Sequence, residues 1–149
     1  MSWLLDTCVL LRTVDSNSQQ QQIALDALDA LDAGQEVVCI VPQSLVEFWA
    51  VSTRPVDENG LGYSTEDTKI EIDRLRQLFV FKSEDETIFE NWEALVSKYN
   101  VIGKTTHDAR LVAAMQTHGI ENLLTFNVAD FKRYVGSINV SAPQDLTRF

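Results

Sequence analysis

Short apolar segments alternate along the whole chain with segments in which apolar positions recur every three to four residues. The short segments have the length and β-branched content of strands, and the longer ones have the periodicity of helices. Strands are predicted at residues 2–5, 36–41, 79–82, 122–125 and 137–140. Because strands and helices alternate, the pattern predicts a parallel sheet with helices on both faces and the last strand at an edge.

Capping residues and breakers place the helices between these strands. Gly34 ends the second helix, Ser64 begins a capping signal, Ser83 is expected to cap the next helix, and Thr105 or Thr106 starts the one after it. The expected helices cover residues 8–13, 19–33, 43–53, 64–78, 83–99, 107–117 and 127–134. Residues 54–63 carry Pro55, the pair Asn59-Gly60 and Gly62, which predict a loop.

The chain has 149 residues, of which 45% are hydrophobic, so a single domain over residues 1–149 is expected. Every apolar run is far shorter than the roughly 20 residues of a membrane-spanning helix. The N-terminus has no basic segment, and an aspartate interrupts its apolar stretch, so we do not interpret it as a signal peptide. The two cysteines, Cys8 and Cys39, are interpreted as small core residues in a reducing cytoplasm.

The formal net charge of −10 limits the classes of function that fit the chain. Proteins that bind nucleic acid usually present a basic face, so the total charge alone argues against that class. It agrees with a nuclease only if acids are concentrated at a metal site and neutralised there. It also agrees with a protein that binds a basic partner.

Several acids are expected at one edge of the sheet. In open α/β sheets, ligands bind beyond the carboxyl ends of the strands. Asp6 follows the first strand, Glu47 lies on the helix after the second, Asp108 lies in the first turn of a later helix, and Asn127 and Asp130 follow the fourth strand. These side chains are far apart in sequence but are predicted to share this edge.

A cluster of carboxylates requires a positive charge among them. Two carboxylates about 4 Å apart repel by about 4 kcal/mol at an effective dielectric constant near 20. Lys104 is the only nearby cation that the sequence suggests. A divalent cation is the stronger candidate, and all-oxygen ligands favour Mg²⁺ or Mn²⁺ over zinc. Such ions support phosphodiester hydrolysis.

Most of these residues also have a purely structural interpretation. Asp6 is suited to cap a helix, and Asp108 is suited to interact with a helix dipole. Asp130, which precedes Phe131, can be interpreted as an ordinary surface acid. His107 and His118 are expected to be helix-end residues rather than ligands.

Glu47 has the weakest support from periodicity. On a helical wheel, Leu45, Val46, Phe48 and Trp49 define the apolar arc, and Glu47 falls largely opposite it. The wheel alone therefore predicts a solvated glutamate.

Four segments in order resemble a known family. They are residues 4–7 (LLDT), 41–47 (VPQSLVE), 107–114 (HDARLVAA) and 123–131 (LLTFNVADF). Together they look like the PIN domain, and especially the VapC-type toxins of type II bacterial toxin–antitoxin pairs. The loop at residues 54–62 resembles one branch of those toxins. The resemblance covers the whole chain.

The resemblance implies a three-layer α/β/α sandwich with a five-stranded parallel sheet, and a Mg²⁺- or Mn²⁺-dependent endoribonuclease. Asp6, Glu47 and Asp108 match the family's three characteristic acids. The fourth acid usually follows the last main strand, where this chain has Asn127, with an acid only at Asp130. We expect Asp6 and Asp108 to bind the metal directly, with Glu47 and either Asp130 or Asn127 completing its ligands. Water activated there would attack phosphorus and leave a 5′-phosphate.

The resemblance also implies partners. These are an RNA substrate, a homodimer partner, and a cognate antitoxin protein whose basic or extended segment covers the acidic cleft. Such an antitoxin would account for the net charge of −10. Thr7 matches a hydroxyl that supports the first aspartate.

Three alternatives stay open at this point. A phosphoacceptor signalling domain has a similar sheet, but it needs a second acid beside Asp6, which this chain lacks. A catalytically silent PIN-like binding module is favoured by Asn127 in place of an acid. A DNA-directed nuclease of the same fold is not distinguished from a ribonuclease, because the group that reads the 2′-hydroxyl is not visible in a motif.

Overall fold

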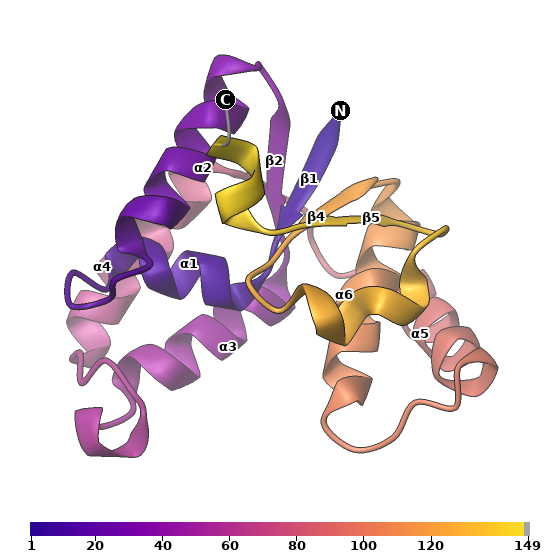
Figure 1. Ribbon diagram of the computed structural model, residues 1–149. Coiled ribbons are helices and arrows are strands. Elements are labelled where there is room, and N and C mark those ends of the chain that lie inside the picture. The colour runs from indigo at the N-terminus through magenta and orange to yellow at the C-terminus, as the bar shows by residue number, and fades with distance from the viewer. Residues whose placement is uncertain (148–149) are drawn as a thin grey trace.

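The computed structural model describes residues 1–147, so the last two residues of the domain predicted for 1–149 lie outside the described part (Figure 1). The sheet has five strands in the order β3-β2-β1-β4-β5, and every neighbouring pair is parallel. The strands are β1 (Ser2–Leu5), β2 (Val37–Ile40), β3 (Val80–Phe81), β4 (Asn122–Leu124) and β5 (Asn139–Ser141). The predicted parallel sheet is confirmed, and its last strand does lie at an edge.

Helices connect the strands as the periodicity predicted. The α-helices are α1 (Thr7–Val14), α2 (Gln21–Ala33), α3 (Pro42–Thr53), α4 (Thr65–Leu78), α5 (Glu86–Lys98) and α6 (Thr105–His118). Three 3₁₀ helices, η1 (Val56–Glu58), η2 (Val128–Tyr134) and η3 (Pro143–Thr147), complete the described chain. The helix expected at residues 127–134 is therefore of the tighter 3₁₀ type, and η3 was not expected.

The sheet separates two hydrophobic cores, as a strand's two-residue period requires. Leu4 and Leu123 face the core formed with α5, α6 and η2. Leu5 and Leu124 face the core formed with α1, α2, α3 and α4. Figure 1 shows these two helical layers on opposite sides of the strands. The three-layer α/β/α sandwich is thus confirmed.

The start of α5 was predicted wrongly. The helix begins at Glu86, and its cap is Asp85, whose side chain accepts the amide hydrogen of Thr87 at 2.8 Å. The backbone carbonyl of Ser83 instead contacts the His118 ring at 3.0 Å. Asp85 rather than Ser83 caps the helix because aspartate is at least as good a cap as serine, and because the Thr87 hydroxyl also donates a hydrogen bond to Asp85.

Both cysteines are free thiols. The sequence predicted two small core residues, but only Cys39 is fully buried. Cys39 is buried in β2, whereas Cys8 is half-buried and contacts polar groups at the end of β1. None of the described helices is both long and apolar enough to span a membrane.

The loop at residues 54–63 is compact rather than extended. The amides of Gly60 and Gly62 donate to the carbonyls of Pro55 and Arg54, both at 2.9 Å. The hydroxyl of Tyr63 donates to the carbonyl of Val14 at 2.8 Å, which ties the loop to the end of α1. This loop extends the arm that carries α3, at the lower left of Figure 1.

Alanine at Gly60 is expected to destabilise the protein by about 1–3 kcal/mol, the usual cost of overpacking. A Cβ atom there would lie 1.9 Å from the carbonyl oxygen of Arg54, so the backbone has to shift. Gly34→Ala is the control, because its Cβ would meet nothing nearer than 3.5 Å. Urea denaturation should show a loss for Gly60→Ala and a change within about 0.5 kcal/mol for Gly34→Ala. Equal stability of the two variants would contradict this account of the loop.

Candidate active site at the carboxyl edge of the sheet

Asp6 lies directly after β1 and caps α1. One carboxylate oxygen, Oδ1, accepts the amide hydrogen of Thr7 at 2.8 Å. The other, Oδ2, accepts the hydroxyl of Thr125 at 2.7 Å and is 3.6 Å from the Cys8 sulfur. Asp6 is therefore a helix cap, and its second oxygen is held by the residue that follows β4.

The Asp6 carboxyl is buried, with 8% of its surface exposed. Burial raises its pKa above the ordinary value, and the charge of Glu47 adds to this, while the hydrogen bonds from Thr125, Thr7 and Cys8 oppose it. Burial and then the charge of Asp6 also raise the pKa of Cys8 to about 12, so Cys8 is a neutral thiol. The surroundings of Asp6 therefore disfavour its ionised form relative to its neutral form.

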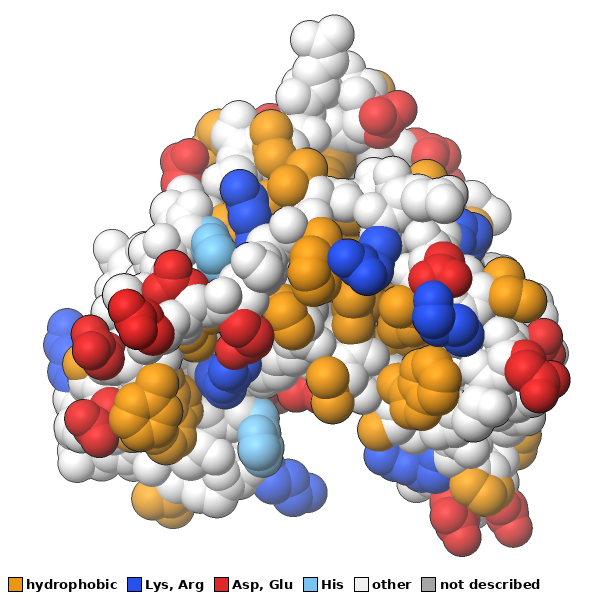
Figure 2. Space-filling view, turned by 180° about the vertical axis from the view of Figure 1, so that it is seen from behind, with side chains coloured by type: hydrophobic (Ala, Val, Ile, Leu, Met, Phe, Trp, Pro, Cys, Tyr) orange, Lys and Arg blue, Asp and Glu red, His pale blue; other side chains and the backbone are white. Residues whose placement is uncertain are grey.

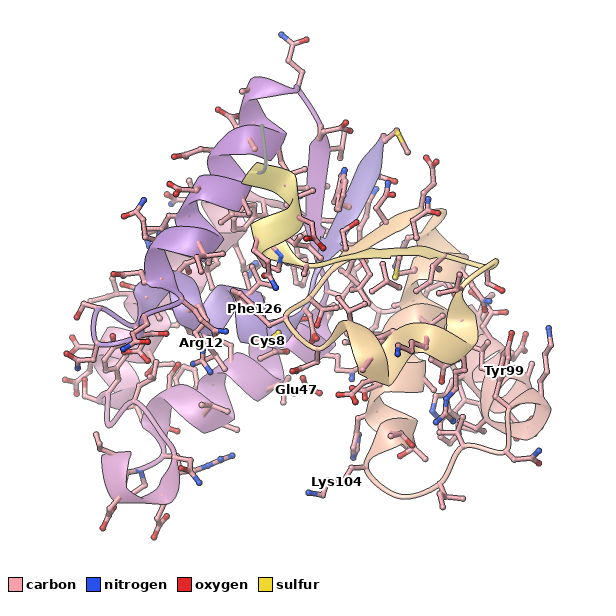
Figure 3. All side chains as sticks on the ribbon, viewed as in Figure 1. Cys8, Arg12, Glu47, Tyr99, Lys104 and Phe126 are labelled. Atoms are coloured by element: carbon pink, nitrogen blue, oxygen red, sulfur yellow. The ribbon has the colours of Figure 1, made fainter. Side chains whose placement is uncertain are left out.

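Glu47 on α3 is fixed at both ends of its carboxylate. The hydroxyl of Thr7 donates to Oε2 at 2.7 Å, and the side-chain amide of Gln43 donates to Oε1 at 3.1 Å. The residue therefore reaches back to the end of β1, forty positions earlier in the chain. Figure 3 shows it between α3 and the region of Cys8.

The helical-wheel interpretation of α3 is wrong. Val46 and Trp49 are exposed, at 69% and 36%, and Glu47 is half-buried. The buried face of this helix uses small polar residues beside large apolar ones. Its members are Ser44, Leu45, Phe48 and Ser52.

Asp108 lies in the first turn of α6 and is half-buried. Its pKa is raised to about 6, first by burial and then by the charges of Asp6, Asp130 and Glu47. The His107 ring lowers it. The charges of three acids from other parts of the chain thus act on the Asp108 carboxyl group, so the four side chains lie near one another.

The two candidates for the fourth metal ligand, Asn127 and Asp130, both follow β4 and differ in their surroundings. Asn127 is exposed and precedes η2, and its backbone amide donates to the Thr125 hydroxyl at 3.0 Å. Asp130 is exposed one turn later and is close enough to raise the pKa of Asp108. Of these two residues, Asp130 is therefore the one whose charge acts on Asp108.

The donor set suits a hard divalent cation. Asp6, Glu47, Asp108 and Asp130 offer only oxygen atoms, and burial followed by neighbouring negative charges raises the pKa of Asp6 and of Asp108. Within residues 1–147, no group of three or more histidine, cysteine, aspartate or glutamate side chains is close enough to hold a metal ion as it stands. Coordination by three or more of these acids would therefore require at least one of the side chains to move closer to the others.

A pocket of about 590 Å³ lies between α3 and α6, and Gln43, Glu47 and Arg110 contribute to its wall. Figure 2 shows the molecule hollowed at its lower edge between two arms, one carrying α3 and the other α5 and α6. Lys104 stands on the second arm at the start of α6, facing open space (Figure 3). The sequence suggested Lys104 as the nearby cation, whereas the basic side chain that lowers the pKa of Asp108 is His107.

Sequence reasoning missed four residues of this site. They are Cys8, Gln43, Arg110 and Thr125. Gln43 had a local signal, because it lies four residues before Glu47 on one helix. Thr125 follows β4, and β4 pairs with β1 in the register that brings Leu124 beside Leu5, so pairing of these strands would have located it.

The fold and the site define an open parallel α/β protein with an acidic cluster beyond the carboxyl ends of β1, β2 and β4. The model of the PIN domain family matches residues 3–136. The chain belongs to the PIN domain family. A comparison with curated protein sequences gives no significant match.

Solved structures of toxin–antitoxin proteins are similar to this chain. VapBC2 from Rickettsia felis, bound to a promoter DNA fragment, is 15% identical with a TM-score of 0.69, over 95% of this chain and 98% of that one. A toxin–antitoxin complex from Klebsiella pneumoniae is 23% identical with a TM-score of 0.63, over 94% and 96%. VapC20 of Mycobacterium tuberculosis, which cleaves the sarcin–ricin loop, is 19% identical with a TM-score of 0.59, over 81% and 86%. At these identities the similarity shows a shared fold.

Proposed function

We propose that this chain is a metal-dependent endoribonuclease and the toxin of a type II toxin–antitoxin pair. The observation that carries the proposal is the cluster at Asp108, whose pKa is raised first by burial and then by the charges of Asp6, Asp130 and Glu47. The proposal is supported by the location of this cluster beyond the strand ends, where α/β proteins bind their ligands. PIN nucleases generally use a divalent metal, and the oxygen-only donor set suits Mg²⁺ or Mn²⁺.

The chain's own residues have distinct roles in this proposal. Asp6, held by Thr125 and Thr7, and Asp108 would bind the cation directly, and Glu47 with Asp130 would complete its ligands. The cation, when bound, would supply positive charge for a substrate phosphate and for the attacking water. Asp130 is preferred to Asn127 as the fourth ligand, because its charge acts on Asp108.

Two partners belong to the proposal. The solved structures similar to this chain include complexes of a toxin with its antitoxin. An antitoxin with a basic segment would match the acidic cluster and the net charge of −10. We also propose a homodimer and a cytoplasmic location, in keeping with VapC-type toxins.

The test is cleavage of labelled RNA and of DNA with the same sequence by the wild-type protein, in Mn²⁺, Mg²⁺ or EDTA. We expect cutting of RNA within the strand in either metal, 5′-phosphate ends on one product, and no cutting in EDTA. Cutting of DNA alone would identify a DNA-directed nuclease. Failure to cut either polymer, together with no thermal stabilisation by Mn²⁺, would favour the silent binding module and contradict the proposal.

A further inference from the structure

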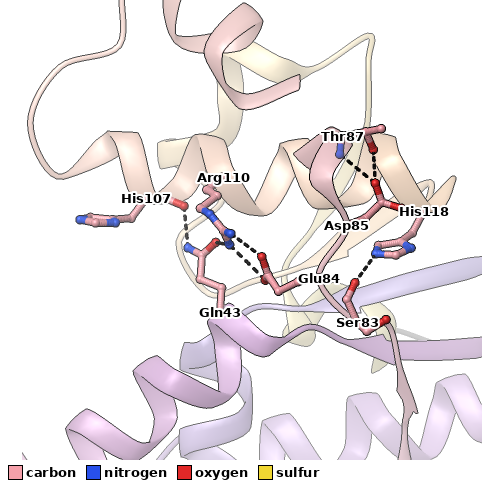
Figure 4. A network of polar contacts seen from close by, with 8 residues as sticks. All are labelled: Gln43, Ser83, Glu84, Asp85, Thr87, His107, Arg110 and His118. Carbon is pink, nitrogen blue, oxygen red and sulfur yellow. Dashed lines mark hydrogen bonds and ion pairs between the residues drawn. The ribbon is translucent and has the colours of Figure 1, made fainter. Parts of the chain in front are cut away.

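Gln43 connects the two helices that carry Glu47 and Asp108. Its side-chain nitrogen donates to Glu47 Oε1 at 3.1 Å, within α3, and to the backbone carbonyl of His107 at 2.8 Å, in the first turn of α6. His107 directly precedes Asp108. One amide group therefore contacts one acid of the cluster and the backbone beside another. Figure 4 shows the second of these contacts, between Gln43 and His107.

The orientation of this amide is fixed by its partners. A guanidinium group can only donate hydrogen bonds, and a backbone carbonyl can only accept them. Arg110 Nη1 lies 3.3 Å from the Gln43 oxygen, and the His107 carbonyl faces the Gln43 nitrogen. Both contacts demand the same orientation, so the donating NH₂ group must face Glu47.

Arg110 is itself held in place. Its Nη2 and Nη1 atoms lie 2.6 and 3.4 Å from the two carboxylate oxygens of Glu84, which precedes α5. This paired geometry restricts the guanidinium plane more than a single contact would. The chain of contacts thus runs from Glu84 through Arg110 and Gln43 to Glu47, as Figure 4 shows for its first three members.

The contacts leave Glu47 able to bind a cation. Each carboxylate oxygen has two acceptor positions, and Gln43 and Thr7 use one on each oxygen. The same contacts restrict the side chain to one orientation, which lowers the entropy lost when a ligand binds.

We propose that Gln43 is a positioning residue that sets the placement of Glu47 relative to Asp108 and thereby the affinity of the cluster for a divalent cation. This inference rests on the proposed function, because it assumes that the acids bind such an ion. Gln43 touches neither substrate nor metal in this account. It acts through Glu47 and through the first turn of α6.

The test uses Gln43→Met, which keeps the length of the side chain and removes its hydrogen bonds, and Gln43→Asn, which keeps the amide but shortens its reach. Gln22→Met is the matched control, since Gln22 makes the same contact with a carboxylate four residues on, Asp26, on an exposed helix face. Mn²⁺ binding is measured calorimetrically without RNA, and RNA cleavage is measured as a function of Mn²⁺ concentration.

Both Gln43 variants are expected to raise the Kd for Mn²⁺ by about tenfold, the usual effect of losing a group that orients a ligand. Cleavage should return to within about threefold of wild type at saturating Mn²⁺, whereas a purely structural defect would lower it at every concentration. Gln22→Met should match wild type. A Kd within twofold of wild type in both Gln43 variants, or an equal change in Gln22→Met, would overturn the positioning role alone. Absence of Mn²⁺ binding to wild type would overturn the proposed function and this role together.

Discussion

Replacing Asp6 by asparagine is expected to reduce RNA cleavage more than about 100-fold while the metal-free protein stays at least as stable as wild type. The loss follows from removing a direct ligand, which should exceed the 10–100-fold effect of removing a group that only orients one. The stability follows from burial. The folded chain raises the pKa of Asp6, so its charge opposes folding at neutral pH.

Asparagine preserves the other task of Asp6. It caps helices as well as aspartate does and can still accept the Thr7 amide hydrogen. In Asp6→Asn, the temperature of unfolding in EDTA should therefore stay the same or rise, while RNA cleavage in Mn²⁺ falls. Asp57→Asn, at an exposed acid in the 54–63 loop, is the control and should change neither. A variant at Asp6 that unfolds readily and retains cleavage in proportion to its folded fraction would show that this residue is only a cap.

Mn²⁺ affinity is expected to fall about tenfold from pH 7 to pH 5. The ligand form of Asp108 is the carboxylate, and a pKa of about 6 means that acid converts most of it to the neutral form over this range. The raised pKa of Asp6 acts in the same direction. Calorimetric titration of Mn²⁺ at several pH values measures this effect, and an affinity independent of pH between 5 and 7 would contradict it.

The same pKa gives a second, metal-free prediction with a definite sign. The Asp108 pKa is about 6 in the folded chain and near the ordinary value of 3.8 when unfolded. Between these values the folded state binds more protons, so the free energy of unfolding falls as pH rises from about 4 to about 6. Urea denaturation in EDTA should show a flatter profile for Asp108→Asn than for wild type. Parallel profiles would mean that the surroundings of Asp108 are not as described.

Local patterns were sufficient to predict most of the fold. Strand and helix periodicities depend on neighbouring residues, so β1 and α4 lie where they were expected. Asp6 and Asp108 could also be located, because each follows a recognisable strand or loop at the carboxyl edge. The prediction for the burial of α3 failed because its inner face holds the small residues Ser44 and Ser52 at full burial, while Trp49 lies outside.

The contacts that shape the site could not be predicted, because they join residues far apart in sequence. The Thr125 hydroxyl that holds Asp6 is 119 positions away, and the Arg110–Gln43 contact spans 67. Glu47 is the clearest case. Its wheel position predicts a solvated side chain, whereas its actual setting depends on Thr7, forty residues earlier.

The metal site is tested by anomalous X-ray diffraction from crystals of the wild-type protein containing Mn²⁺, beside crystals of Asp6→Asn. We expect a Mn²⁺ peak at the carboxyl edge of the sheet, within bonding distance of Asp6 and Asp108, and no peak there in the variant. A wild-type peak at another place, or an equal peak in Asp6→Asn, would contradict the claim that these acids form the metal site of a nuclease.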